Sequence, residues 1–163
     1  MDDELNLNGI NSVLFVCMGN ICRSPSAEAV LRHKANALGL SLMIDSAGTV
    51  GAHAKEKPDH RAQKVAQERG YSFDGIKARK VSAQDFNDFD LILAMDKANL
   101  DDLHNIAPEP LKYKAALFLD FSQHYLETEV PDPYYGGANG FRFVLDLVED
   151  ASDGLLKAIS SNN

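Results

Sequence analysis

Short apolar runs recur along the chain and predict four β-strands. The first run, residues 13–16, contains only branched or aromatic apolar side chains, which is typical of a strand buried on both faces. Three further runs lie at residues 42–44, 90–95 and 114–119. Each run is too short for a helix, so we expect all four to be strands of one parallel sheet.

Segments with apolar residues at helical spacing separate the predicted strands. Within residues 26–38 the apolar positions recur every three or four residues, and Gly39 is suited to end that helix. Asp59 and Asp96 are each suited to cap the start of a helix. We therefore expect further helices from Asp59 to Gly70, at residues 82–87, from Asp96 toward Pro108, and at residues 138–160.

The alternation of strands and helices predicts a single α/β domain. The 163 residues contain no internal repeat and no low-complexity linker, and their number suits one domain with a sizeable core. We place this domain at residues 11–163. Residues 1–10 are mostly polar and are expected to form a flexible N-terminal tail.

Charge and cysteine content argue against several classes of protein. A net charge of −8 does not suit a general nucleic-acid or membrane-surface binder, which needs a basic face. No apolar run reaches membrane-spanning length, and the acidic residues 1–4 do not fit a signal peptide. The two cysteines form no disulfide framework and no zinc pattern. We therefore expect a cytoplasmic protein without a metal.

The candidate chemistry lies where the first strand meets the first helix. Ser24 and Pro25 are suited to the cap and the first position of that helix, so residues 17–23 must form a tight loop. Such a loop turns backbone N–H groups inward at the positive end of a helix dipole and makes a concave anion site. The residues expected to form this cradle are Met18, Gly19, Asn20, Ile21 and Cys22.

This loop begins with a thiol and ends with a guanidinium. The inward N–H groups and the cation stabilise the Cys17 thiolate, and Arg23 can hold two phosphoryl oxygens. We therefore predict in-line attack of Cys17 on phosphorus, giving a phosphocysteine that water later removes. Gly19 is expected to supply backbone freedom, Asn20 to tolerate left-handed geometry, and Ser24 to donate its hydroxyl to the departing sulfur.

A structural interpretation of the same residues is also available. A lone cysteine at a strand end is usually a buried core thiol, and an arginine on a helix is usually a surface cation. The complete Cys-x5-Arg-Ser pattern between a strand and a helix favours the functional interpretation.

Two further polar residues are expected at the same edge of the sheet. The carboxyl ends of parallel strands meet at one edge, so Ser46 lies near the Cys17 loop and could bond to it, or it could be an ordinary turn serine. Capping alone would explain Asp96, although its position also allows a secondary role at the site.

A second chemical stretch follows at residues 130–137. Asp132 lies between Pro131 and Pro133, which restrict the backbone and aim one carboxyl group. A phosphatase needs an acid for the leaving oxygen and then a base for water, and one carboxylate can serve as both. Tyr134 and Tyr135 can form a pocket wall for an aryl substrate. A proline-rich loop with partly exposed tyrosines is the alternative.

Four segments together resemble the low-molecular-weight protein tyrosine phosphatases. They are residues 17–25, Asp45-Ser46-Ala47-Gly48-Thr49, Met95-Asp96 and Asp132-Pro133-Tyr134-Tyr135, in family order and spacing. The resemblance covers nearly the whole chain after the tail. It implies a three-layer, flavodoxin-like fold with a four-stranded parallel sheet in the order 2-1-3-4, helices on both faces, and hydrolysis of phosphotyrosine without a cofactor.

The resemblance also implies residue roles and partners. Cys17 would be the nucleophile, Arg23 the phosphate clamp, Asp132 the general acid and Ser24 the helper at the leaving thiolate. Asn20 and Ser46 would shape the loop through hydrogen bonds. Cys22 would form a reversible, protective disulfide with Cys17. The implied partner is a phosphotyrosine-containing protein, with a tyrosine kinase as one candidate, and the resemblance implies inhibition by phosphate-like oxyanions and a monomer or weak dimer.

The chain departs from the family pattern at three positions. Ala52 occupies the usual place of an aromatic residue on the pocket rim, and Lys55 occupies a frequent glycine position. Ile76 stands where many relatives have a histidine. The rim is therefore expected to be wider, more mobile and more basic, and the loop to be looser or braced by other groups.

Two alternative functions use the same cradle. A glutathione-coupled arsenate reductase would attack an arsenate oxyanion with Cys17, whereas thioredoxin-coupled reductases use further cysteines that this chain lacks. A non-catalytic phosphotyrosine-binding module is the second alternative. Hydrolysis of an aryl phosphate, measured beside glutathione-dependent arsenate reduction, separates the three.

Overall fold

The computed structural model describes residues 7–133 and 137–161 of the chain. Its sheet contains β1 (Ser12–Cys17), β2 (Met43–Gly48), β3 (Leu91–Ala94) and β4 (Ala115–Leu117). All neighbouring strands are parallel, in the order β2-β1-β3-β4. The predicted sheet and strand order are therefore confirmed.

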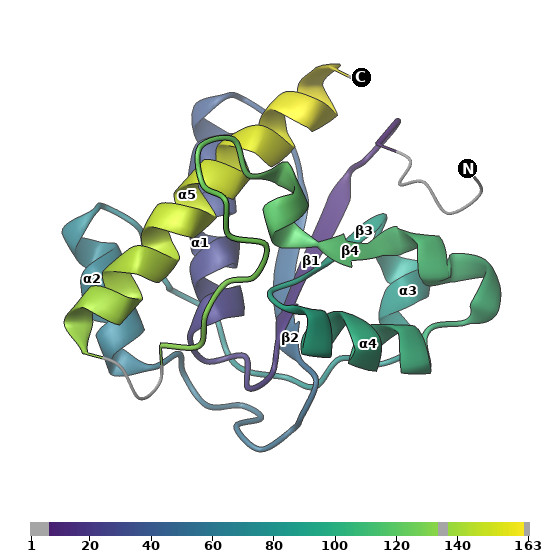
Figure 1. Cartoon of the computed structure of the whole chain (residues 1–163), viewed down its shortest axis with the longest axis horizontal. Coiled ribbons are helices and arrows are strands. Elements are labelled where there is room, and N and C mark those ends of the chain that lie inside the picture. Colours follow the sequence, from purple (N-terminus) through teal and green to yellow (C-terminus); the bar gives the residue numbers. More distant parts are fainter. Residues whose placement is uncertain (1–6, 134–136, 162–163) are drawn as a thin grey trace.

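Helices cover both faces of this sheet. Figure 1 shows α1 (Arg23–Ala37), α2 (His60–Glu68) and α5 (Ala138–Ser161) on one side, and α3 (Asp85–Asp88) and α4 (Lys97–Ile106) on the other. This is the expected three-layer arrangement. No helix in the described part of the chain is long and apolar enough to cross a membrane.

Every residue of strand β1 is buried. Its two faces contribute to two different hydrophobic cores, one on each side of the sheet. Val13, Phe15 and Cys17 face the core beneath α1 and α5, whereas Leu14 and Val16 face the core beneath α3 and α4. An apolar run without alternation is what a central parallel strand requires.

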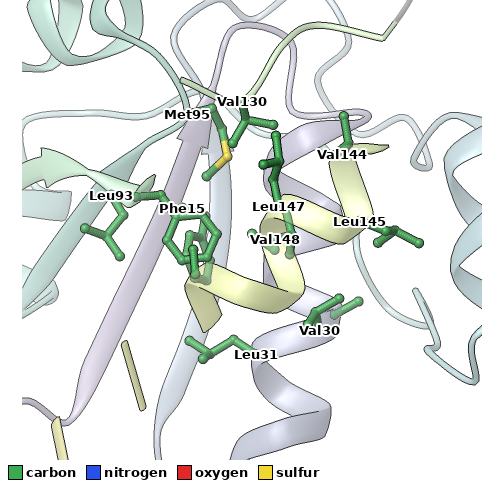
Figure 2. Packing of buried hydrophobic residues seen from close by; sticks show 14 of the residues in the cluster. Phe15, Val30, Leu31, Leu93, Met95, Val130, Val144, Leu145, Leu147 and Val148 are labelled. Atoms are coloured by element: carbon green, nitrogen blue, oxygen red, sulfur yellow. The ribbon is translucent and has the colours of Figure 1, made fainter. Parts of the chain in front are cut away.

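The larger core joins β1 to α5. In Figure 2, Phe15 points toward α5, where Leu147 and Val148 lie. The Phe15 ring also meets Phe118 edge to face, with 4.8 Å between the ring centroids. The helix that we predicted at residues 138–160 is confirmed, and its apolar stripe is buried as expected.

Several elements differ from the sequence-based prediction. The fourth strand ends at Leu117, because Phe118–Phe121 turns into a 3-10 helix. Strand β2 is longer than expected and runs on through Gly48. A further 3-10 helix, Glu109–Lys114, precedes β4 and was not predicted.

The start of α1 was also predicted wrongly. The helix begins at Arg23, so Ser24 is not its cap, and the residue before it, Cys22, provides no side-chain cap bond. Ser24 is fully buried, and its hydroxyl contacts the Cys17 sulfur instead. The caps expected from Asp59 and Asp96 are confirmed, since each carboxylate accepts an N–H from the first turn of its helix.

Candidate active site

The loop between β1 and α1 lies at the carboxyl edge of the sheet, at the lower end of Figure 1. Cys17 is the last residue of β1, and Arg23 is the first residue of α1. The loop is shaped at Asn20, which has a φ of 57°. Gly19 is not left-handed; a side chain there would meet the His53 ring at 3.2 Å. Gly19 therefore provides space rather than the predicted backbone freedom.

Cys17 lines a cavity of about 240 Å³. Its Sγ is 3.0 Å from the Ser24 hydroxyl, and the Asn20 backbone N–H donates to it at 3.3 Å. The residue is only 3% exposed, but its loop opens into the cavity. The lining residues are Cys17, Met18, Gly19, Ile21, Cys22, Arg23, His53 and Asp132.

Asn20 connects the loop to two neighbours. Its side-chain amide donates to the Ser24 hydroxyl at 2.8 Å, and its Oδ1 accepts the Arg79 backbone N–H at 3.0 Å. Because the hydroxyl accepts from Asn20, its own proton is left for the Cys17 sulfur or for the Ala47 carbonyl at 3.4 Å.

The brace of the loop is therefore the Arg79 backbone. Ile76 is buried in the core at 5% exposure and takes no part in it. The Arg79 side chain is held in turn by Asp85, at 2.9 and 3.1 Å, and by Asp45. Sequence reasoning missed Arg79, because a backbone contact leaves no signature in residue type.

Arg23 is held on the opposite side of the loop. Its guanidinium donates to the Asp96 carboxylate at 2.7 Å and to the Val130 carbonyl at 3.0 Å. Burial would lower the pKa of Arg23, but the Cys17 thiolate and the Asp96 and Asp132 carboxylates outweigh burial and raise it. The guanidinium is thus a fixed positive charge, and Asp96 is both its carboxylate partner and the cap of α4.

Asp132 lines the cavity from the loop before α5. Its carboxylate lies 3.9 Å from the Arg23 guanidinium, and its side chain is 45% exposed. The preceding segment is anchored because the Val130 N–H donates to the Met95 carbonyl at 2.8 Å. Figure 2 shows Met95 and Val130 side by side. Tyr134 and Tyr135, the expected pocket wall, lie outside the described residues.

Ser46 does not contact the loop as predicted. In the sheet it pairs with Phe15, two residues before Cys17. Its hydroxyl donates to the Glu28 carboxylate of α1 at 2.6 Å, and Arg32 contacts the same carboxylate. Ser46 therefore joins β2 to α1 behind the loop.

Cys22 is a buried thiol on the same cavity. Burial raises the pKa of Cys22 to about 12, and the negative charges of Asp59, Cys17 and Asp132 act in the same direction. Cys22 is therefore protonated at neutral pH.

The rim of the cavity differs from the expected one. Ala52 is exposed and does not line the cavity, whereas the next residue, His53, does. The His53 Nδ1 lies 2.7 Å from the Glu56 carboxylate. Lys55 has a φ of 72°, a left-handed geometry that glycine adopts without strain. Sequence reasoning did not single out His53.

A buried sulfur, a fixed guanidinium and a carboxylate thus converge on one small cavity. Backbone and hydroxyl donors surround the sulfur, and the helix dipole of α1 points its positive end there. This arrangement can bind a tetrahedral oxyanion and place its central atom over the sulfur.

Known proteins are similar to this chain over almost its whole length. A family model described as low molecular weight phosphotyrosine protein phosphatase matches residues 12–163. The Schizosaccharomyces pombe enzyme of that description is 41% identical over 151 residues, covering 91% of this chain and 96% of that protein. A low molecular weight protein-tyrosine-phosphatase of Bacillus subtilis is 43% identical over 150 residues, covering 91% and 95%.

A solved structure of a protein tyrosine phosphatase is also similar to this chain. The protein tyrosine phosphatase of Entamoeba histolytica, with Hepes in its active site, matches with a TM-score of 0.90 and 44% identity. The match covers 93% of this chain and 97% of that one. None of these names supports the arsenate reductase alternative. The chain therefore belongs to the low molecular weight protein tyrosine phosphatases.

Proposed function

We propose that Cys17, Arg23 and Asp132 carry the hydrolysis of phosphotyrosine in this protein. The observation that supports this most directly is the convergence of the Cys17 sulfur, the fixed Arg23 guanidinium and the Asp132 carboxyl on one cavity of about 240 Å³. The family hydrolyses phosphotyrosine through a phosphocysteine. The roles of the individual residues are our assignment.

In the first step, the Cys17 thiolate attacks phosphorus in line with the tyrosyl oxygen. The sulfur–phosphorus bond forms and the phosphorus–oxygen bond breaks, while protonated Asp132 gives its proton to the leaving phenoxide. Arg23 and the N–H groups of residues 18–22 hold the three equatorial oxygens.

In the second step, Asp132 takes a proton from water as the water attacks the phosphocysteine. The sulfur–phosphorus bond breaks, and the Ser24 hydroxyl, 3.0 Å from the sulfur, donates to the returning thiolate. Phosphate is the product. Other tetrahedral oxyanions of similar size compete for the same donors and should therefore inhibit.

Cys22 is assigned a protective role against oxidation. Peroxide converts the Cys17 thiolate to a sulfenic acid, which condenses with the neighbouring Cys22 thiol to a disulfide with loss of water. Thiol reductants would reverse this step. The Cys22→Ser variant should therefore lose activity irreversibly with peroxide, whereas the parent enzyme should recover with dithiothreitol; equal recovery of both would contradict this role.

The remaining assignments concern the protein as a whole. The family acts on phosphoproteins, and we propose phosphotyrosine proteins, a tyrosine kinase among the candidates, as its substrates. We further propose a cytoplasmic monomer or weak dimer, with one domain at residues 11–163 and a tail at residues 1–10. Tyr134 and Tyr135 are proposed as the wall for the tyrosyl ring.

The test uses two aryl phosphates that differ in leaving group. Cys17→Ser should abolish turnover of both. Asp132→Asn should slow phenyl phosphate by roughly 10²–10⁴. With p-nitrophenyl phosphate, whose phenoxide leaves without an acid, this variant should accumulate a phosphoryl group on Cys17, detectable by mass spectrometry after acid quench. Normal rates in Asp132→Asn would remove that residue from the mechanism.

A further inference from the structure

Two segments beside the cavity concentrate positive charge. Residues 51–58 and 76–81 contain five lysines or arginines and one acidic residue, in a chain whose net charge is −8. Four of the five are exposed lysines, which we call the basic strip: Lys55, Lys57, Lys77 and Lys80.

The fold holds the two segments together and against the phosphate loop. The Lys55 N–H donates to the Ala78 carbonyl at 2.6 Å, and the Ala78 N–H donates to the Glu56 carbonyl at 2.8 Å. Directly before the first segment, the Val50 N–H donates to the carbonyl of Met18 in the phosphate loop at 3.1 Å. The backbones of the two segments are therefore held beside the phosphate loop, and His53 of the first segment lines the cavity.

Three acids near the strip, Asp45, Asp85 and Glu56, already contact other side chains. Arg79, the fifth basic residue, is paired with Asp45 and Asp85. Glu56 contacts His53 at 2.7 Å. Within residues 7–133 and 137–161, no ion pair within 4 Å is found for any lysine of the basic strip. Lys57 and Lys77 line a hollow of about 170 Å³, which also has Asp74 on its wall.

Lys55 adds a second observation, because its backbone is left-handed with φ of 72°. A residue with a side chain is disfavoured in that geometry by about 1 kcal/mol. Glycine at this position would avoid the strain, yet the chain has a lysine there, two residues after His53.

We infer that the basic strip binds acidic side chains of the substrate protein next to the phosphotyrosine. This inference rests on the proposed function, since it concerns the substrate of the same cavity. Phosphotyrosine enters the cavity, and aspartate or glutamate residues a few positions away meet the ammonium groups of the strip. The favoured substrates are therefore phosphotyrosine segments with flanking acids, and the rest of the surface, which is acidic, repels such segments unless they approach over the strip.

The test compares two phosphotyrosine peptides that differ only in flanking Asp/Glu or Asn/Gln residues. Exposed charge pairs each change an affinity only a few-fold, so the parent enzyme should favour the acidic peptide about tenfold in kcat/KM. The preference should be present at about 0.1 M salt and absent at about 1 M, where charges a few ångströms apart are screened.

The variants remove charge without disturbing the turn. Lys55→Gly suits the left-handed backbone, and Lys55→Gly/Lys80→Gln should lower the preference about threefold. Adding Lys57→Gln and Lys77→Gln should abolish it. The control is Lys112→Gln/Lys157→Gln, which changes net charge as much as the two-lysine variant does, in the 3-10 helix before β4 and in α5, and should keep the full preference.

Two further measurements separate this inference from the proposed function. Phenyl phosphate has no flanking residues, so its hydrolysis reports the cavity alone and should be the same in all lysine variants. Fluorescence anisotropy with Cys17→Ser measures peptide binding without turnover and should show the same tenfold preference. An unchanged preference in the four-lysine variant, or no preference for the acidic peptide in the parent enzyme, would overturn the inference, whether or not phenyl phosphate is hydrolysed.

Discussion

Two hydrogen-bonded networks hold the phosphate loop from opposite sides, and their charges lie in different places. On the Arg23 side, the guanidinium itself enters the cavity, and two carboxylates, Asp96 and Asp132, lie against it. On the Asn20 side, the contacts are made by neutral groups: the Asn20 amide, the Ser24 hydroxyl and the Arg79 backbone N–H. Within the described residues, the charged groups of this second network form no hydrogen bond to the loop themselves; they are the Arg79 guanidinium and its acidic partners, Asp45 and Asp85.

This difference follows from what the loop must bind. A thiolate and a phosphate dianion both need positive potential, so an acid near them is tolerated only when it is paired with the cation. Neutral groups can fix the backbone without adding negative charge. We therefore expect the Arg23 network to act on the substrate directly, and the Asn20 network to act by holding the loop.

The largest effect that tests this comparison is expected from Arg23→Lys. Lysine keeps the charge but loses the planar fork that grips two oxygens and reaches both Asp96 and Val130. We expect kcat/KM for aryl phosphates to fall by roughly 10²–10³, the usual effect of losing a transition-state donor. Steady-state kinetics measure it, and a loss below tenfold would show that charge alone is sufficient.

A smaller effect is expected at Asn20, where two substitutions separate backbone from side chain. Both Asn20→Gly and Asn20→Ala lose the bonds to Ser24 and Arg79, but only glycine fits the φ of 57° without strain. We expect kcat/KM to fall about tenfold for Asn20→Gly. We expect a larger fall for Asn20→Ala, because alanine also pays about 1 kcal/mol for the left-handed backbone. Equal values for the two variants would show that the backbone geometry does not matter.

Arg79→Met tests how far the second network reaches. The backbone N–H that binds Asn20 remains, so we expect kcat/KM to fall less than about fivefold. The free energy of unfolding should fall more clearly, by about 1–3 kcal/mol, because buried Asp85 loses two hydrogen bonds to a charged group. Urea titration and kinetics on the same sample compare the two quantities. A loss of activity as large as that of Arg23→Lys would remove the distinction between the networks.

Glu28, buried behind the loop at 4% exposure, should affect stability but not activity. Burial raises its pKa above the ordinary 4.5, although Ser46 and Arg32 oppose this. The protonated form is thus favoured in the folded protein, and this contribution to stability is lost as pH rises from about 4.5 through the raised pKa. Glu28→Gln cannot ionise, so its unfolding free energy should rise relative to the parent from about pH 4 to about pH 7. A constant difference would contradict the shifted pKa.

Much of the phosphate loop could be predicted from local sequence. The Cys17–Arg23 spacing fits the turn from a buried strand to a helix, and Asn20 was expected to tolerate the left-handed geometry that it adopts. Asp96 was expected at a helix cap and is found there. These features depend on residues close in sequence, where propensity and capping act directly.

The predictions were wrong where one side chain could form a hydrogen bond with any of several partners. Ser24 was suited to a cap but contacts Cys17, and Ser46 was expected at the loop but bonds to Glu28. Both hydroxyls are buried, so each must find a partner, and the partner is decided by which segments the fold packs nearby.

The sequence by itself therefore determined the strand and helix pattern, the sheet and the chemical identity of Cys17 and Arg23. The apolar periodicity predicts the strands and helices, and the spacing of Cys17 and Arg23 predicts the loop, because both depend on residues close in sequence. Only the tertiary structure decided that Arg79 braces Asn20 and that His53 forms the rim, because both depend on contacts between distant segments. Spacing along the chain says nothing about which distant backbone or ring will lie against the loop.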